Sequence, residues 1–186
     1  MMPLPVLEKA AAQMLNYEGS GMSVMEMSHR SKYYDDIING AQDVLRRVLN
    51  IPDNYKILFM QGGATMQFSA IPLNLMVTGK ADYAITGNFA RNAAKEARKF
   101  GTVQIAATSE ADNFTWIPTQ DQLNLDPTAD YFYFCANNTI FGTEWKYDPE
   151  TGDVPVVADM SSNILSKPVD VSKYGVIMAG AQKNMG

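Results

Sequence analysis

Two ionisable side chains near the end of the chain follow apolar runs that are typical of buried strands. Asp159 follows the run at residues 154–158, and Lys183 comes shortly after the run at residues 174–179. A carboxylate beside a pyridinium nitrogen keeps that ring protonated, and a lysine amine can bond to an aldehyde. Pyridoxal phosphate uses both groups. Asp159 and Lys183 therefore predict a site for this cofactor, with Lys183 as the catalytic residue, although singly they also fit a turn aspartate and a surface lysine.

A glycine-rich turn precedes a predicted helix at Gly62-Gly63-Ala64-Thr65. Two glycines allow a tight turn, and the start of a helix offers unpaired N–H groups and a positive dipole end to an anion such as a phosphate. The segment matches neither the Walker A loop nor the dinucleotide-binding pattern of three glycines. Taken alone, a tight turn without a ligand explains it better than an anion site does.

Four further residues have types that suit ligand binding. Phe89 follows a strand end and could stack on a heteroaromatic ring, and Thr139 could hydrogen-bond to a ring hydroxyl. His29 and Arg30 place the single histidine beside a forked cation that binds phosphate or carboxylate. Each has a structural alternative: a core aromatic residue, a turn threonine and an ordinary helix-start pair.

The pattern of apolar residues predicts alternating helices and strands. Helices are expected over residues 5–17, 31–48, 65–77 and 88–100. Strands are expected over residues 55–60, 83–85, 102–107, 114–117, 131–134, 154–158 and 174–178. This order predicts an α/β fold with a mainly parallel sheet covered by helices on both faces. Ligands of such sheets lie at the carboxyl ends of the strands, where Gly62, Gly87, Asp159 and Lys183 are expected.

Composition limits the class of protein. The 186 residues are 46% hydrophobic, enough for a sizeable core, and the net charge is −5 with no basic run, so we expect no nucleic-acid partner. The single cysteine, Cys135, lies in an apolar run and suits a buried thiol in a reducing compartment. No run of about 20 apolar residues predicts a membrane span. We expect a cytoplasmic protein with no membrane partner and no metal site.

Four segments together carry a specific resemblance. They are residues 21–30 (GMSVMEMSHR), 61–68 (QGGATMQF), 158–162 (ADMSS) and 179–184 (AGAQKN). In this order and spacing, the chain resembles the phosphoserine aminotransferases, class-V, fold-type-I pyridoxal-phosphate enzymes, over essentially its whole length. The resemblance implies the large-domain fold of those enzymes and pyridoxal 5'-phosphate as cofactor.

The resemblance also implies a role for each candidate residue. Lys183 would bond to the cofactor aldehyde, and Asp159 would pair with the pyridinium nitrogen. Gly63, Ala64 and Gln182 would hold the cofactor's phosphate. Thr139 would hydrogen-bond to its ring hydroxyl, and Phe89 would stack on its ring. His29 and Arg30 would bind the substrate's phosphate or carboxylate. Phe89 stands where tryptophan is usual in the family, and Asn138 stands where glutamate is common.

The implied reaction is transamination between O-phospho-L-serine and 2-oxoglutarate, which gives 3-phosphooxypyruvate and glutamate in serine biosynthesis. Residues 1–186 would be the part of the cofactor-binding large domain that runs through the lysine, with the small carboxyl-terminal domain absent. In the family a later strand lies between the strands at residues 55–60 and 174–178, and the complete enzyme is a homodimer. We therefore expect this polypeptide alone to expose apolar surface and to show little turnover.

Three alternatives remain from the sequence. A non-catalytic anion-binding or nucleotide-binding module would need only the turn at residues 62–65. A truncated product could act only by associating with full-length subunits. Another small-substrate enzyme of fold type I, such as a cysteine desulfurase, would also use Lys183; the strand position of Cys135 argues against the desulfurase, and His29 and Arg30 favour a phosphorylated substrate.

Overall fold

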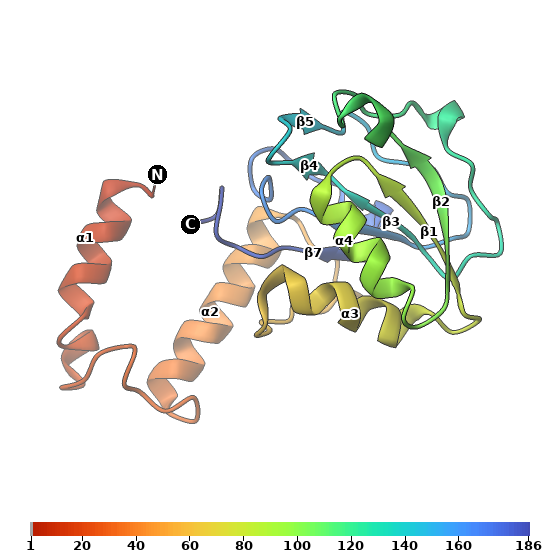
Figure 1. Ribbon diagram of the computed structural model, residues 1–186. Coiled ribbons are helices and arrows are strands. Elements are labelled where there is room, and N and C mark those ends of the chain that lie inside the picture. The colour runs from red at the N-terminus through yellow and green to blue at the C-terminus, as the bar shows by residue number, and fades with distance from the viewer. Residues whose placement is uncertain (1) are drawn as a thin grey trace. The chain divides into compact units, whose positions relative to one another are not determined.

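The computed structural model describes residues 2–186, which divide into two compact units. The amino-terminal unit holds residues up to 57 together with Gly186, and the sheet unit holds residues 58–185 (Figure 1). No helix in residues 2–186 combines the length and apolar character needed to cross a bilayer.

The amino-terminal unit is helical. It contains α1 (Leu4–Gln13), the short 3₁₀ helix η1 (Tyr17–Gly19) and α2 (Lys32–Val48). Ser31 caps α2, because its Oγ accepts a hydrogen bond from the Tyr34 N–H at 3.2 Å. At the other end of α2, the Arg46 guanidinium donates to the carbonyl oxygens of Ile51, Pro52 and Tyr55 and closes the following turn. The second predicted helix is confirmed, and the first ends four residues earlier than expected.

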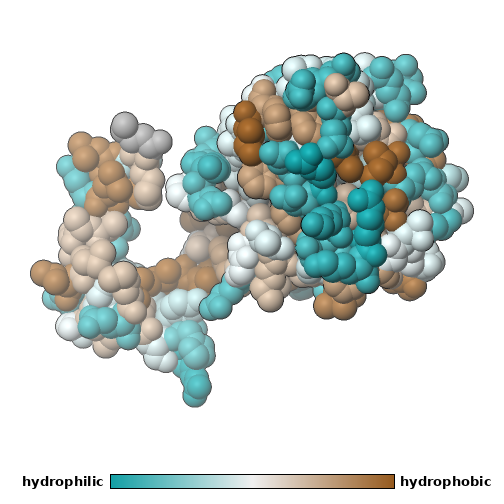
Figure 2. All heavy atoms as spheres, in the orientation of Figure 1, coloured by the Kyte–Doolittle hydropathy of each residue, from teal (hydrophilic) through white to brown (hydrophobic). Residues whose placement is uncertain are grey.

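No residue of α1 or α2 is buried. Val44 and Val48 of α2 are 47% and 60% exposed, although they lie on its apolar face. Figure 2 shows hydrophobic colours over most of the visible surface of α1. Apolar side chains of both helices therefore remain exposed to solvent.

The sheet unit is built on five parallel strands. They are β1 (Lys80–Ile85), β2 (Thr102–Thr108), β3 (Phe132–Cys135), β6 (Val156–Asp159) and β7 (Val176–Met178). Their order across the sheet is β2-β1-β3-β6-β7, and every neighbouring pair is parallel. The short strands β4 (Asn137–Asn138) and β5 (Thr143–Glu144) form a separate antiparallel hairpin. The predicted α/β class and parallel sheet are confirmed.

The two faces of the sheet are covered differently. Helices α3 (Gly63–Leu75) and α4 (Asn88–Ala97) pack on one face (Figure 1), where small α4 side chains lie against Tyr83 and Tyr133. On the other face, Phe134 and Trp145 lie in a core covered by loops. Those loops include the 3₁₀ turns η3 (Gln120–Gln122) and η4 (Val171–Lys173). The 3₁₀ turn η2 (Glu110–Asp112) leads instead into Phe114, which packs in the core on the helix-covered face. Within the sheet unit, helices thus cover one face and not both.

Two predicted strands are absent from the described residues. Residues 55–60 form no strand, and Leu58, Phe59 and Met60 are 73%, 49% and 62% exposed. A strand requires a hydrogen-bonding neighbour, and no strand of the sheet pairs with this segment. Residues 114–117 form no strand because Asn113 and Phe114 have φ of 53° and 58°, which turn the chain.

Candidate active site

The carboxyl ends of the parallel strands bring the predicted residues to one edge of the sheet. In register, Cys135 at the end of β3 lies opposite Asp159 at the end of β6, and Asp159 lies opposite Met178 of β7. The Cys135 thiol is buried, and burial raises its pKa well above the usual value, as expected for a structural cysteine. Gly87 follows β1 at the same edge, whereas Gly62 follows the irregular segment that was predicted to be a strand.

Asp159 is a buried carboxylate without a cationic partner among residues 2–186. Its side chain is 3% exposed; Oδ1 accepts the Ser161 N–H at 2.9 Å, and Oδ2 accepts the Tyr133 hydroxyl at 3.4 Å. Burial raises the pKa of Asp159, and the hydrogen bonds from Ser161 and Tyr133 oppose that rise. A cationic ligand at this carboxylate would offset the cost of keeping it ionised.

The loop that carries Lys183 contacts both the end of β6 and the start of α3. The Gly180 N–H donates to Ser161 Oγ at 2.8 Å. A Cβ placed on Gly180 would lie 3.5 Å from the backbone nitrogen of Ala64 and 3.5 Å from Ser161 Oγ. Three segments that are far apart in the sequence, near Ala64, Asp159 and Gly180, therefore meet at this edge.

Helix α3 begins in a conformation that leaves its first N–H groups pointing out of the helix. Gly62 and Gly63 have φ of 89° and 58°, and no side chain caps the helix. A Cβ on Gly62 would lie 2.3 Å from Met66 Sδ, so glycine is required there by space as well as by backbone angle. Unpaired N–H groups and the helix dipole can together bind an anion at this end.

A buried polar network lies on the other side of the sheet edge, and sequence reasoning missed it. Asn138, 3% exposed, donates from Nδ2 to Thr86 Oγ1 at 3.2 Å and to Thr143 Oγ1 at 3.0 Å. Phe89, 42% exposed, and Thr139, also exposed, flank the network. One signal was available in the sequence: the hydroxyl of Thr86 directly follows a fully apolar strand end.

Lys183 is exposed and lies in a segment without helix or strand, so the enclosure suggested by the preceding apolar strand is not found among the described residues. Gln182 is also exposed, and its N–H donates to the Gly180 carbonyl at 2.8 Å. Asn184 anchors the far end of the segment, because its Nδ2 donates to the Ile164 carbonyl at 3.0 Å. The lysine therefore sits on a loop that is held on both sides while its own side chain is accessible.

His29 and Arg30 belong to the amino-terminal unit, in the turn before α2, and both are exposed. The Arg30 N–H donates to Ser28 Oγ at 3.2 Å, while Ser31 caps the helix. The two side chains are accessible to a ligand, and their role in substrate binding stays a prediction.

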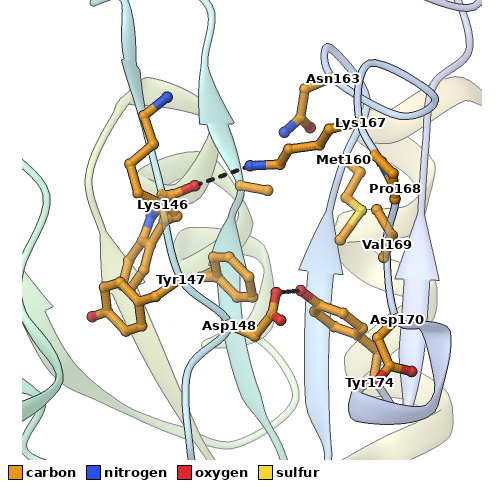
Figure 3. A pocket seen from close by; sticks show the side chains of 13 residues that line it. Lys146, Tyr147, Asp148, Met160, Asn163, Lys167, Pro168, Val169, Asp170 and Tyr174 are labelled. Atoms are coloured by element: carbon orange, nitrogen blue, oxygen red, sulfur yellow. Dashed lines mark hydrogen bonds between the residues drawn. The ribbon is translucent and has the colours of Figure 1, made fainter.

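A separate pocket of about 240 Å³ lies among the loops on the helix-free side of the sheet (Figure 3). Lys167 and Glu144 form an ion pair at 3.1 Å beside it. The Tyr174 hydroxyl donates to Asp148 (Figure 3). None of the predicted cofactor or substrate residues lines it. Within residues 2–186, no group of three histidine, cysteine, aspartate or glutamate side chains could hold a metal ion.

Comparison with known proteins gives consistent matches. Residues 1–186 match the family described as "Aminotransferase class-V". The phosphoserine aminotransferase of Bacillus cereus is 55% identical over 187 residues, which cover 100% of this chain and 52% of that protein. The chain spans about half the length of the curated relatives it matches.

Solved structures agree in fold. The phosphoserine aminotransferase from Bacillus circulans subsp. alkalophilus superposes with a TM-score of 0.95 at 45% identity, covering 100% of this chain and 52% of that one. The PLP-bound phosphoserine aminotransferase from Trichomonas vaginalis gives a TM-score of 0.92 at 42% identity, covering 100% of this chain and 53% of that one.

Proposed function

Because the chain belongs to the aminotransferase class-V family, we propose that residues 1–186 form the cofactor-binding portion of a pyridoxal-phosphate-dependent phosphoserine aminotransferase. The reaction is the reversible transfer of an amino group from O-phospho-L-serine to 2-oxoglutarate, which gives 3-phosphooxypyruvate and glutamate. The observation that carries this proposal is the buried Asp159 carboxylate, which lacks a cation in residues 2–186 and lies beside the contact between Gly180 and Ala64.

The residues at the sheet edge suit the chemical groups of pyridoxal phosphate. The Asp159 carboxylate would accept a hydrogen bond from the ring nitrogen and keep it protonated. Gly63 and Ala64, at the open start of α3, would bind the phosphate through backbone N–H groups, with Gln182 adding a side-chain donor. When bound, the cofactor supplies an electron-withdrawing ring that stabilises negative charge at the substrate's α-carbon.

Exposed side chains of the sheet unit would make the remaining contacts to the ring. Phe89 would stack on the ring and Thr139 would hydrogen-bond to its hydroxyl, and both side chains are accessible. His29 and Arg30, from the amino-terminal unit, would bind the substrate's phosphate or carboxylate. The complete enzyme would be a cytoplasmic homodimer of amino-acid biosynthesis.

Lys183 would move the proton that the reaction displaces. Its amine would hold the cofactor before substrate arrives and would then take a proton from the substrate's α-carbon. This transfer requires the amine of Lys183 in its neutral form.

The covalent role of Lys183 can be tested on protein expressed from its complete reading frame. With added pyridoxal phosphate we expect a visible absorption band, and borohydride reduction should attach the cofactor to the peptide that contains Lys183. Lys183→Ala should lose both signals. Lys173→Ala, which removes a lysine of the sheet unit paired with Asp148 at 2.8 Å, is the matched control and should keep both. A label on a different lysine, or none, would contradict the proposal.

The substrate is tested separately on the same preparation. We expect formation of glutamate from 2-oxoglutarate with O-phospho-L-serine and much slower formation with L-serine. Arg30→Ala should raise the KM for O-phospho-L-serine more than it lowers kcat, because it removes a binding contact common to ground and transition states. Equal rates with the two amino acids would overturn the phosphorylated substrate but leave the cofactor site standing.

A further inference from the structure

We infer that Asn138 is a positioning residue for the cofactor site, which holds Phe89 and Thr139 in place relative to one another. The inference rests on the proposed function, because Phe89 and Thr139 are the ring contacts assigned there. It comes from a buried set of hydrogen bonds that joins the end of β1 to the β4–β5 hairpin. Figure 1 shows this hairpin beside the start of α4.

The first support is the hydrogen bonding of the Asn138 amide. Its Nδ2 donates to Thr86 Oγ1 at 3.2 Å and to Thr143 Oγ1 at 3.0 Å, and Trp145 Nε1 donates to Thr86 Oγ1 at 3.4 Å. Thr86, Asn138 and Trp145 are 0%, 3% and 2% exposed. Buried donors that lose their partners are costly, so the four side chains hold one arrangement.

The second support is the close approach of Asn138 to Gly87. Gly87 is the N-cap residue of α4, with an extended backbone at φ 177°, so its backbone angles do not require glycine. Space requires it: a Cβ there would lie 2.6 Å from Asn138 Oδ1 and 3.1 Å from Cγ. The Asn138 amide thus lies against the backbone that leads through Asn88 into Phe89, and a Cβ at residue 87 would collide with it.

The third support is the turn that follows Asn138. Its carbonyl oxygen accepts the N–H groups of Phe141 at 3.1 Å and Gly142 at 2.8 Å. Thr139 lies inside the turn closed by these bonds. Phe141 in turn packs on the buried Phe114, with ring centroids 4.8 Å apart. One residue therefore connects the backbone before Phe89 with the turn that presents Thr139.

Asn138 acts through its neighbours and does not bind the cofactor itself. At 3% exposure it offers almost no surface to a ligand, and its donors are already used within the protein. Aspartate at this position would keep the shape but lose both N–H donors. Leucine would keep the branched shape but lose every polar contact of the side chain. Both substitutions therefore remove the hydrogen bonds that Nδ2 donates.

The test measures cofactor binding to protein from the complete reading frame. For Asn138→Leu and Asn138→Asp we expect the Kd for pyridoxal phosphate to rise about 10- to 100-fold, in line with the loss of buried hydrogen bonds. We also expect weaker visible circular dichroism of the bound cofactor, because this signal depends on how the ring is held. Thr151→Val is the control, since Thr151 Oγ1 donates to the Val154 carbonyl at 2.6 Å in a loop outside the hairpin; its Kd should stay within about twofold.

A second pair of variants keeps the test decisive if the first ones lose stability. Thr86→Val and Thr143→Val each remove one hydroxyl without changing side-chain shape. We expect both variants to raise the Kd for pyridoxal phosphate. The double variant Thr86→Val/Asn138→Leu should have the same Kd as Asn138→Leu, because the two residues act as one unit. Folded variants with unchanged Kd and dichroism would overturn the inference. Absence of cofactor binding in the unaltered protein would instead overturn the proposed function.

Discussion

At the level of a single residue, the burial of Asp159 and the ionisation of its carboxylate oppose each other. Its carboxylate is buried and accepts hydrogen bonds from Ser161 and from the Tyr133 hydroxyl, and burial raises its pKa. A raised pKa means that the folded protein holds the proton to a higher pH than the unfolded chain does. Ionisation therefore costs the cofactor-free protein stability as pH rises through the folded pKa, and the cost is complete above it.

Asp159→Asn tests this opposition. Asparagine cannot ionise, so the cofactor-free variant should be more stable than the unaltered protein at pH 7, and the difference should shrink as pH falls toward 4. Its affinity for pyridoxal phosphate should fall about 100-fold, because the ring nitrogen loses its ion pair. Thermal unfolding between pH 4 and 8, together with a cofactor titration, measures both effects. If the stability of the Asp159→Asn variant and that of the unaltered protein changed equally with pH, the raised pKa of Asp159 would be contradicted.

The candidate residues could be predicted from sequence to different extents. Asp159 can be singled out because a lone carboxylate follows an apolar run, and the structure shows that it is buried; its role at the cofactor stays a prediction. The network of Asn138, Thr86 and Thr143 could not be found in this way. Thr86 and Thr143 lie 52 and 5 residues from Asn138. The position of Thr86 after a strand suggests a buried hydroxyl, but nothing in the local sequence indicates that the three side chains meet.

At the level of the element, the start of α3 depends on glycine for two separable reasons. Gly62 has φ of 89°, and a Cβ there would overlap the Met66 side chain at 2.3 Å. Gly79 has nearly the same angle, φ of 87°, but nothing lies within 4 Å of the position of its Cβ. The two glycines therefore differ in steric space while sharing the backbone conformation.

Gly62→Ala and Gly79→Ala are a matched pair for measuring that difference. Gly79→Ala should cost about 1 kcal/mol, from backbone strain alone. Gly62→Ala should cost about 1 to 3 kcal/mol more, because the helix start must shift to relieve the overlap, and its cofactor affinity should fall as well. Urea denaturation measures the two free energies of unfolding. Equal losses would show that the Met66 contact does not matter.

Strands can be predicted from sequence where an apolar run is buried in the sheet. They are missed where strand formation depends on a neighbouring strand. The buried apolar runs of β1, β3 and β6 were located to within a few residues. The run at residues 55–60 has the same apolar character but forms no strand, since strand formation depends on a neighbour that local sequence does not specify. The run at residues 114–117 failed because Asn113 and Phe114 adopt positive φ.

At the level of the whole molecule, exposed apolar side chains matter more than any single contact. Leu58, Phe59 and Met60 are adjacent and exposed, and Leu73 of α3 is 69% exposed. A run of exposed apolar residues beside unpaired backbone favours association between molecules. The unfolding free energy of the sheet unit should depend little on these side chains, since they are not buried in it.

We therefore expect the 186-residue polypeptide, expressed alone, to self-associate. Leu58→Ser/Phe59→Ser should reduce the associated fraction several-fold while changing the unfolding free energy by less than about 1 kcal/mol. Light scattering and urea denaturation measure the two quantities. Phe68→Ser, at a position 4% exposed in the core, is the contrasting variant and should destabilise the fold by about 3 kcal/mol or more. Unchanged scattering in the double variant would contradict the expectation.

The hydrogen bond between Gly180 and Ser161 also limits how far Lys183 can move from the sheet edge. Gly180 is anchored beside Asp159, and Lys183 comes three residues later, so its Cα can travel at most about 11 Å from that anchor. A primary amine on so short a tether stays at a high effective concentration near the carboxylate even when its loop moves. Capture of an aldehyde at this edge would then be governed by the length of the tether more than by the rigidity of the loop.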